Sequence, residues 1–243
     1  MNLQSLFFSF NLLSAITIIT MNERVLQILM DSFMKILMAG IRVTIPLAVL
    51  SFFFALIISI LVAVIQYADI KGLKQLCRFY IWIIRGTPLL VQLYVVFYGL
   101  PSVGIVLPAF PSAVLCFAIN EGAYMAESMR AALEAVPKGQ LEAGYCVGMN
   151  YWQIMRRIIL PQAFRTAFPS LSNSFISMIK STSMASTITV SEMIRQTQII
   201  NGRVYQSLAL YLEVGFIYLI FCTILTWLQS WGEKKLNAYG GTR

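Results

Sequence analysis

The sequence predicts an all-α, polytopic membrane protein of about five spanning helices, with a polar helical hairpin on one side of the bilayer. Composition leads to this class, because 58% of the 243 residues are hydrophobic and only 12% are charged, against roughly 25% charged in soluble domains. The mean hydropathy is +0.76. Several uncharged stretches also exceed the about 20 residues that a helix needs to cross a bilayer.

Residues 43–68 form the first predicted span, because 26 residues without a charge lie between Arg42 and Asp69. The segment before it, residues 1–20, is apolar but short and lacks the positive start of a secretory signal. We expect an interfacial segment there, with a sixth span as the alternative. The predicted domains are the N-terminal segment 1–37, the transmembrane domain 38–235 and the cytoplasmic tail 236–243.

The next uncharged stretch, residues 86–120, is 35 residues long and therefore too long for one span. Its glycines and prolines predict a short loop between two helices, over residues 79–101 and 109–133. Gly86 and Pro88 are also residues that break or bend a helix, and both lie inside the first of these two predictions.

The last two predicted spans each contain one charged residue. Residues 166–191 are apolar apart from Lys180, and residues 204–231 are apolar apart from Glu213. Inside a bilayer an ionisable group costs several kcal/mol unless it is paired or faces water, so such a group is a functional candidate by default. The pattern assigns no role to Glu213.

Loop charges predict the orientation of the chain. Twelve lysines and arginines fall in the loops 69–85 and 128–165 and after the last predicted span, in residues 232–243, whereas five fall on the opposite side. Cytoplasmic loops of membrane proteins carry the excess of basic residues. We therefore expect a multi-pass protein of the bacterial cytoplasmic membrane, with the N-terminus outside and the C-terminus in the cytoplasm.

The composition excludes several kinds of chemistry. The chain contains no histidine, and its four cysteines lie 30 or more residues apart without a C-x-x-C pair. The sequence also lacks a G-x-x-x-x-G-K-[ST] phosphate loop. We expect no metal site, no cofactor and no enzymatic activity in this chain.

A polar hairpin is predicted at residues 139–161, between two apolar spans. Gly148 suits the left-handed residue after a first short helix, Asn150 suits the N-cap of a second, and Pro161 is expected to end that second helix. A plain interfacial loop and a DNA-binding helix-turn-helix are alternative interpretations. Predicted membrane spans flank the hairpin closely on both sides, and no third helix is predicted beside it. Both observations argue against DNA binding.

The hairpin carries a motif: Glu142-Ala143-Gly144, three residues, Gly148, nine residues, then Ile158-x-Leu160-Pro161. This motif resembles the loop that marks membrane subunits of bacterial ABC importers, with Gly144 where alanine is usual. Three further stretches, "RGTPLLVQL" (85–93), "GAYMAESMRAALEAVPKGQLEAG" (122–144) and "LPQAFRTAFPSLSNSFISMIKSTSM" (160–184), narrow the resemblance to the polar amino-acid permeases. It covers about residues 38–235.

The resemblance implies the permease subunit of an ATP-driven importer that carries a polar amino acid. It further implies ABC ATPase subunits that hold ATP and Mg²⁺, a second permease subunit (identical or paralogous), an external solute-binding protein and a lipid environment, with no nucleic acid. The hairpin would be the coupling helix that docks on the ATPase. The coupling residues would be Glu142, Ala143, Gly148, Arg156, Ile158 and Pro161. Simple capping and interfacial anchoring is the alternative for Glu142 and Arg156.

Charged residues predicted inside the bilayer are candidates for the substrate path. Glu121 and Lys180 both lie about 12 residues into their spans, near the bilayer centre. Glu121 could bind the ammonium group of an amino acid, and a buried pair with Lys180 is the alternative. Glu127 could line the path too, or form a structural pair with Arg130 or Lys180.

Hydroxyl groups supply further candidates. Ser183 lies in "KSTSMASTIT" (180–189) and is expected to line the path, although hydroxyls in a helix also bond to their own backbone carbonyls. Thr44, near the start of the first span, is a further candidate. Glu192 is expected to be an exposed helix-end carboxylate, with an outer gate as the alternative.

Two other functional classes stay open at this stage. A secondary transporter or channel could use Glu121, Glu127 and Lys180 as an ion relay, but five spans without an inverted repeat argue against it. A membrane-tethered DNA-binding regulator is the other class. Glutamine, a basic amino acid and cystine all remain candidate substrates.

Overall fold

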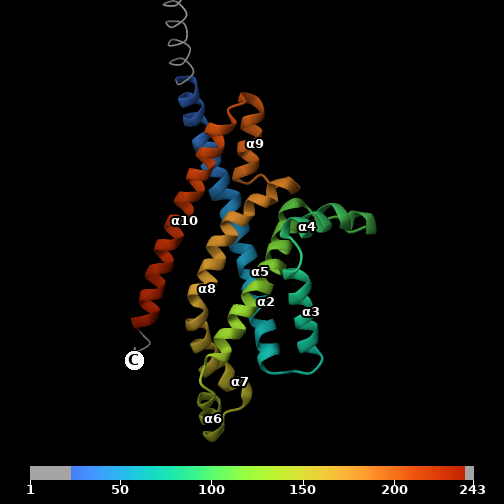
Figure 1. The fold of residues 1–243 in the computed structure, drawn as a ribbon, viewed down its shortest axis with the longest axis vertical. Helices are drawn as coiled ribbons and strands as arrows, with labels where there is room; N and C mark the ends of the chain where they lie inside the picture. The colour runs from blue at the N-terminus through green and yellow to red at the C-terminus, as the bar shows by residue number, and fades with distance from the viewer. Residues whose placement is uncertain (1–22, 239–243) are drawn as a thin grey trace, which may run out of the picture.

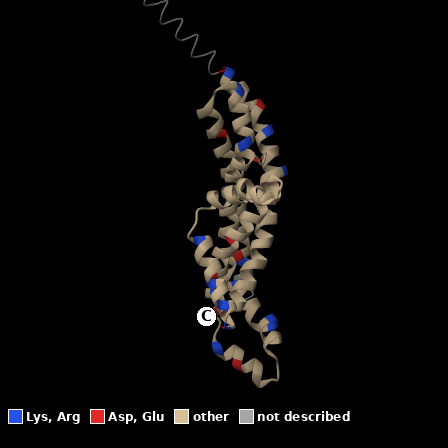
Figure 2. Ribbon diagram, turned by 90° about the vertical axis from the view of Figure 1, so that its right-hand side faces the viewer, with Lys and Arg blue, Asp and Glu red and all other residues tan. Residues whose placement is uncertain are grey.

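The computed structural model describes residues 23–238, and all regular elements among them are helical (Figure 1). This confirms the all-α prediction. Figure 2 shows charged residues toward both ends of the molecule, separated by a belt in which they are nearly absent. Such a distribution is what a bilayer-spanning protein requires, because charges are costly in hydrocarbon.

The first helix runs without interruption from Glu23 to Tyr67 and is longer than the predicted span 43–68. It contains a π-helical segment, η1 (Gly40–Thr44), followed by α2 (Ile45–Tyr67). The Ile45 N–H bonds to the Gly40 carbonyl five residues back, so Pro46 falls at the start of a new register. The helix passes through residue 38 without a break, and the domain boundary predicted there stays a prediction. The segment 1–20 lies outside the described residues.

The prediction of one continuous helix over residues 79–101 is wrong. The chain instead forms α3 (Leu73–Arg85) and α4 (Leu89–Tyr94), followed by η2 (Val95–Gly99) and η3 (Leu100–Val103). The two halves are bent by 99° at the break, and Figure 1 shows α4 turning away from α3. Pro88 is the cause, because it has no N–H to donate and restricts the residue before it to an extended conformation.

The helix α5 (Ala109–Glu134) matches the prediction 109–133 and packs along α2 at the centre of the fold. Small buried residues make this close approach feasible. On α2 they recur at helical spacing: Ala48, Ser51, Ala55, Ser59 and Ala63. On α5, a Cβ added to Gly122 would lie 2.9 Å from Ile58 Cγ2. The polar side chains of α5 are therefore held at fixed positions relative to α2.

The hairpin forms α6 (Lys138–Cys146) and α7 (Tyr151–Ile154), and Figure 1 shows it at one end of the molecule. The prediction that Pro161 ends the second helix is wrong. A π-helical segment, η4 (Met155–Ile159), leads directly into α8 (Leu160–Ser181). Because Pro161 falls in the first turn of α8, where the register changes, its missing N–H does not interrupt the helix. The hairpin is thus joined rigidly to α8.

The span predicted over residues 166–191 is also shorter as an α-helix. After Ser181 the chain tightens into a 3₁₀ segment, η5 (Thr182–Ile188), and Thr189 adopts a left-handed conformation. The remaining helices are α9 (Met193–Val204) and α10 (Ser207–Ala238). The left-handed Tyr205 separates them, which moves the start of the last helix a few residues past the predicted 204.

Two described helices are long and apolar enough to cross a membrane, Glu23–Tyr67 and Ser207–Leu236, and the bent pair α3–α4 is a third candidate. The helices α5 and α8 have 26 and 22 residues, which is sufficient length, but they are more polar. Thirteen residues of α5 are buried against other helices, so its polar side chains need not face lipid. The number of five spans stays a prediction.

Candidate functional site

A polar cavity of about 530 Å³ lies between α3, α5 and α8. Serines and an asparagine from α8 recur at the spacing of one helix face. The α5 side contributes acidic and aromatic groups. The lining consists of Arg85, Glu121, Tyr124, Glu127, Ser128, Ser170, Asn173, Ser174 and Ser177. We call this space the polar cavity. Its Ser170 hydroxyl donates to the Ser128 hydroxyl at 2.9 Å, which ties α8 to α5.

The Glu121 carboxylate faces this cavity, and the Ser174 side chain approaches it from α8. Lys180 does not line the cavity, and among the described residues it forms no ion pair with Glu121. The alternative in which these two charges neutralise one another is therefore wrong. The Glu121 carboxylate remains free to interact with a molecule in the cavity.

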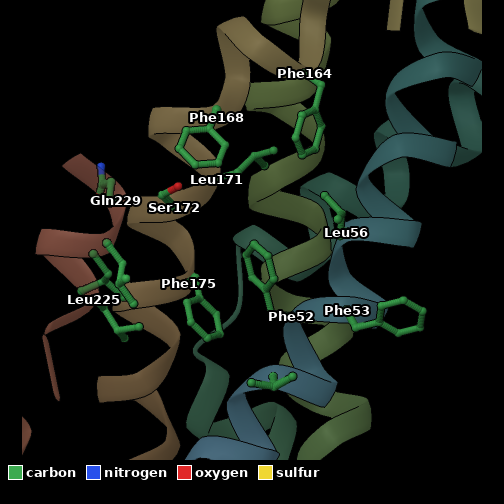
Figure 3. A pocket seen from close by; sticks show the side chains of 13 residues that line it. Phe52, Phe53, Leu56, Phe164, Phe168, Leu171, Ser172, Phe175, Leu225 and Gln229 are labelled. Atoms are coloured by element: carbon green, nitrogen blue, oxygen red, sulfur yellow. The ribbon is translucent and has the colours of Figure 1, made fainter. Parts of the chain in front are cut away.

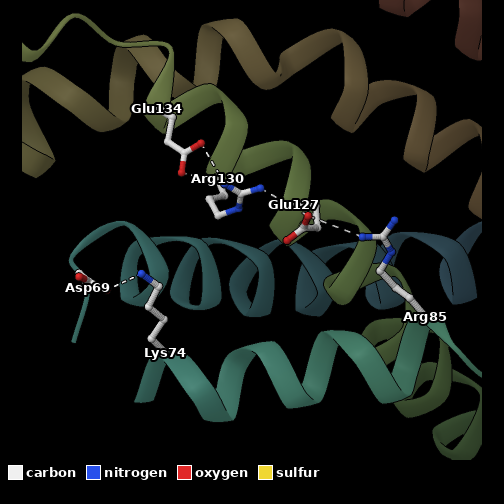
Figure 4. Close-up of polar contacts among 6 residues, drawn as sticks. All are labelled: Asp69, Lys74, Arg85, Glu127, Arg130 and Glu134. Atoms are coloured by element: carbon white, nitrogen blue, oxygen red, sulfur yellow. Dashed lines mark hydrogen bonds and ion pairs between the residues drawn. The ribbon is translucent and has the colours of Figure 1, made fainter. Parts of the chain in front are cut away.

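Glu127 lies in a chain of ion pairs instead (Figure 4). Its Oε2 is 3.7 Å from Arg85 Nη1 and 3.5 Å from Arg130 Nη2. Arg130 Nη1 in turn lies 2.7 Å from Glu134 Oε1. The pair with Arg130 is the one expected from i,i+3 spacing, whereas a pair with Lys180 is not formed. These ion pairs connect the end of α3 to α5, and they pair the Glu127 carboxylate with cations of the same protein.

A separate ion pair holds the loop between α2 and α3, also drawn in Figure 4. The Lys74 ammonium donates to the Asp69 carboxylate and lowers the pKa of that carboxyl group below its ordinary value. Asp69 itself adopts a left-handed conformation, with φ of 53°. Because the carboxylate is exposed, the pair orders the loop without contributing much to stability.

Gln92 connects the break between α3 and α4 to α5, a feature that sequence reasoning missed. Its Nε2 lies 2.9 Å from the Ile84 carbonyl and 3.2 Å from the Thr87 carbonyl. Its Oε1 accepts from Asn120 Nδ2 at 3.1 Å. The side chain thus bonds the backbone carbonyls that the proline break leaves without helix partners. The available signal was a lone amide four residues after Pro88 in an apolar stretch.

Replacing Gln92 by leucine should therefore lower the thermal stability of the purified protein. The substitution leaves the part-buried Ile84 carbonyl and the buried Asn120 amide unpaired, and each unsatisfied buried group costs about 1–3 kcal/mol. Gln66→Leu is the matched control, because the Gln66 amide nitrogen is buried without a partner among the described residues. Thermal unfolding in detergent, followed by tryptophan fluorescence, measures both. Equal shifts for the two variants would contradict the role of Gln92.

Ser183 and Thr44 do not line the polar cavity. The Ser183 hydroxyl donates to the Lys180 carbonyl at 2.7 Å, and its neighbours in η5 bond the same way to carbonyls three residues back. This is the backbone-bonding alternative considered for the hydroxyl-rich segment. Thr44 is fully buried at the end of η1, and its hydroxyl has no partner among the described residues.

Two carboxylates connect helices at the end of the molecule opposite the hairpin. Glu192 is fully buried, so the expectation of an exposed helix-end carboxylate is wrong. It caps α9 by accepting from the Ile194 and Arg195 N–H groups, and the Tyr218 hydroxyl donates to it at 3.0 Å. Glu213 accepts from the Ser32 hydroxyl at 2.5 Å and so joins α10 to the first helix. Both carboxylates are thus structural connections.

The bend of the hairpin follows the local sequence. Gly148 is left-handed, with φ of 77°. The Met149 N–H donates to the Gly144 carbonyl at 3.1 Å. This bond spans six residues and ends α6 in a Schellman-type motif. Asn150 Oδ1 accepts from the Gln153 N–H at 2.9 Å and Gln153 Oε1 accepts from the Asn150 N–H at 2.9 Å, a reciprocal capping box. The structure therefore has the left-handed glycine and the asparagine cap at the predicted positions.

The outer surface of the hairpin is available to another molecule. Five of the six predicted coupling residues are exposed and Ile158 is partly buried: the exposed ones are Glu142, Ala143, Gly148, Arg156 and Pro161. Three large apolar side chains beside the bend are exposed as well, Tyr145 by 50%, Val147 by 77% and Trp152 by 72%. Sequence reasoning missed these three, although Trp152 falls outside the buried stripe of α7 and η4. Exposed aromatic and aliphatic groups of this kind mark protein interfaces.

Comparison with known proteins supplies the family. The family described as "Binding-protein-dependent transport system inner membrane component" matches residues 55–238. The chain belongs to this family. The chain is 46% identical to the L-cystine transport system permease protein TcyB of Bacillus subtilis (strain 168), over 88% of this chain and 92% of that protein. It is 42% identical to the probable amino-acid ABC transporter permease protein PatM of Vibrio harveyi, over 86% and 95%.

Solved structures agree with this family. A structure titled "Crystal structure of an amino acid ABC transporter with histidines" contains a chain that is 34% identical to the permease, with a TM-score of 0.77. The match covers 85% of the permease and 96% of that chain. An inward-facing methionine transporter, MetNI, is 20% identical with a TM-score of 0.71 and shows the shared fold. The protein is thus a helical membrane permease of the amino-acid ABC transporter class.

The glycine at position 144 has a structural explanation in the permease. A Cβ there would lie 2.7 Å from Ile154 Cγ1 and 2.9 Å from its Cδ1. Ile154 is fully buried and packs α7 against α6. The glycine therefore accommodates the large side chain that faces it across the hairpin.

Introducing alanine at position 144 should destabilise the hairpin by about 1–3 kcal/mol through overpacking. In the double variant Gly144→Ala/Ile154→Ala the new methyl group has room, so the combined cost should be less than the sum of the single costs. Gly139→Ala is the control, because a Cβ there meets no atom within 4 Å. Unfolding in detergent measures the wild type and the four variants. Strict additivity of Gly144→Ala and Ile154→Ala would refute the contact.

Proposed function

We propose that this permease moves a polar amino acid across the bacterial cytoplasmic membrane, along a path that includes the polar cavity. The observation that carries the proposal is the position of Glu121. Its carboxylate faces a cavity whose α8 side consists of hydroxyl and amide groups, and no intramolecular cation among the described residues pairs with it. A carboxylate in this setting suits the ammonium group that every α-amino acid carries, and the α8 side chains suit its polar remainder.

ATP would drive this movement from a separate subunit. The permease has no phosphate loop, so ATP and Mg²⁺ belong on a partner ATPase. The partner would bind the cytoplasmic hairpin through Glu142, Arg156 and the exposed apolar groups beside them. Because η4 continues into α8, displacement of the hairpin by the ATPase would move α8, whose polar face lines the cavity.

Two permease subunits, identical or paralogous, would enclose the path, with a solute-binding protein on the outside. Lys180 supports a second subunit, because it is exposed on α8 without an ion pair among the described residues. An unpaired lysine within a predicted span requires water, lipid headgroups or another protein chain. The orientation proposed from the loop charges, with the C-terminus inside, brings the hairpin to the side where ATP is available.

Reconstitution tests the proposal. The permease is co-expressed with the genes beside its own, purified with the subunits that bind it and placed in liposomes. Uptake of labelled L-cystine, L-glutamine and L-arginine is then measured. L-cystine is the first candidate because the relative that is 46% identical is named for it. ATP-dependent uptake of one of these substrates is expected. Uptake by the permease alone, driven by an ion gradient, would overturn the proposal in favour of a secondary transporter.

A further inference from the structure

A second cavity, of about 480 Å³, lies between α2, α8 and α10 (Figure 3). Its lining is aromatic and aliphatic, and Ser172 and Gln229 are the two polar residues among the described ones that line it. We call it the α8–α10 groove and define it by Phe52, Phe168, Leu171, Phe175, Leu225 and Leu228. The volume is that of a small-molecule site. The apolar lining suits a hydrocarbon chain, but it offers no partner for the charged ammonium and carboxylate groups of an amino acid.

The groove and the polar cavity lie on opposite faces of α8. The groove uses Phe164, Phe168 and Phe175, at spacings of one and two helical turns. The cavity uses Ser170, Asn173, Ser174 and Ser177. At 100° per residue, the average directions of these two sets differ by roughly half a turn. The groove therefore opens away from the polar cavity, between the two described helices that are long and apolar enough to cross a membrane, and this position suits contact with the lipid bilayer.

The groove has basic residues at one end. A Cβ on Gly232 of α10 would lie 2.8 Å from Phe168 Cζ, so these two positions are at the same level. The helices α8 and α10 run antiparallel (Figure 1). Arg165, three residues before Phe168, and Lys235, three residues after Gly232, consequently lie at the same end of the groove, on the side of the hairpin.

This end also has the features of a membrane interface. The Lys235 ammonium lies 5.1 Å from the centroid of the Trp231 ring. Tryptophan and lysine together are typical of the level at which lipid headgroups begin. Gln229 lines the groove near the level of Pro169, with its Nε2 3.5 Å from the Pro169 carbonyl and 2.9 Å from Glu233 Oε1. The end of the groove nearest the hairpin is thus bordered by two basic side chains, Arg165 and Lys235, and by the Glu233 carboxylate, which already accepts from Gln229.

We propose that the α8–α10 groove binds one acyl chain of an anionic phospholipid, whose phosphate lies between Arg165 and Lys235. Burial of the methylene groups against the phenylalanine rings contributes a binding free energy that does not depend on the headgroup. The two basic side chains supply the preference for an anionic headgroup over a zwitterionic one. The Phe52 and Phe175 rings, whose centroids are 5.0 Å apart, form part of the wall that this chain would contact. This inference does not depend on which amino acid is carried.

Lipid retention tests the proposal. The permease, purified with the subunits that bind it, is exchanged into detergent containing equal amounts of phosphatidylglycerol and phosphatidylcholine. Native mass spectrometry then counts the lipids that remain bound. The wild type should retain phosphatidylglycerol in preference. Leu225→Trp fills the groove and should reduce bound phosphatidylglycerol about tenfold, the change that about 1.4 kcal/mol produces. Ile224→Trp places the same bulk on an exposed part of α10 outside the groove and should have no effect.

The headgroup has its own variant. Arg165→Ala combined with Lys235→Ala should keep acyl-chain binding but lower the preference for phosphatidylglycerol by about tenfold or more. Lys71→Ala, in the exposed loop before α3, is the control. Equal retention of lipid by the wild type and Leu225→Trp would overturn the proposal, as would an unchanged headgroup preference in the double variant.

A photo-crosslinker identifies the occupant directly. With p-benzoylphenylalanine in place of Phe53, which lines the groove and is more than half exposed, irradiation in membranes should add the mass of a phospholipid. A crosslink to a second protein chain would assign the groove to a subunit interface and overturn the lipid proposal. This readout does not require a functional transporter, so its failure is distinct from a failure of the transport function.

Discussion

Uptake of the amino acid should fall about tenfold to a hundredfold when Glu121 is replaced by glutamine. A hydrogen bond to a charged group is worth about 1.5–3 kcal/mol, and glutamine keeps the shape of the side chain but not the charge that holds an ammonium group. The reconstituted transporter measures this as the initial rate of ATP-dependent uptake. Because Glu121 itself lies in the middle of α5, which ends at Glu134 before the hairpin begins, the amount of co-purified ATPase should not change.

Glu213→Gln is the control for this experiment. Glu213 is also a carboxylate in a predicted span, but it bonds to Ser32 and lies outside the polar cavity. Its substitution should leave the substrate dependence of uptake unchanged. If Glu121→Gln transports as well as the wild type, the carboxylate does not hold the substrate. If the ATPase is lost from the purified complex, Glu121 has a structural role instead.

Truncating Trp152 to alanine should weaken binding of the ATPase by about thirtyfold or more. Exposed tryptophans at the centre of an interface are typical energetic hot spots, each worth about 2 kcal/mol or more. Trp152 is 72% exposed beside the hairpin bend, so its removal should change the stability of the permease itself by about 0.5 kcal/mol or less. Co-purification at graded ATPase concentration measures the affinity, and uptake should fall in parallel.

Trp227→Ala provides the matched comparison, because Trp227 is 68% exposed on α10, away from the hairpin. It should leave ATPase binding unchanged. Unaltered ATPase affinity in Trp152→Ala would favour the alternative in which the hairpin is a plain interfacial loop. A second substitution, Val147→Ala, measures how much the bend of the hairpin contributes to ATPase affinity apart from Trp152. Val147 suits this purpose because it lies next to Gly148 on the α6 side.

Several features of this permease could be predicted because they depend on residues close together in the chain. The start of α5 follows from Pro108, and its end follows from Pro137, which comes three residues after Glu134. The left-handed Gly148 and the cap at Asn150 follow from side-chain size and hydrogen bonding within a few residues. The class of membrane protein follows from composition, which is a sum over the whole chain and needs no structure.

Other features could not be predicted, since they depend on where separate helices lie. Pro88 marks the break between α3 and α4 in the sequence, but the hydrogen bond that Asn120 of α5 donates to Gln92 beside this break depends on where α5 lies. Nor could depth along the spans pair charges correctly. The sequence predicts similar levels for Glu121 and Lys180, but a pair also requires that the two side chains point toward one another from their helices.

The sequence by itself determined the class of protein, the hairpin and the set of ionisable residues inside the predicted spans. The tertiary structure decided which of those residues meet: Glu127 joins Arg85 and Arg130, whereas Glu121 faces a polar cavity. It also decided that the two faces of α8 serve different surroundings, one polar and one apolar. The physical reason is that caps and helical periods depend on local bonding, whereas cavities form from the relative positions of helices that are distant in the chain.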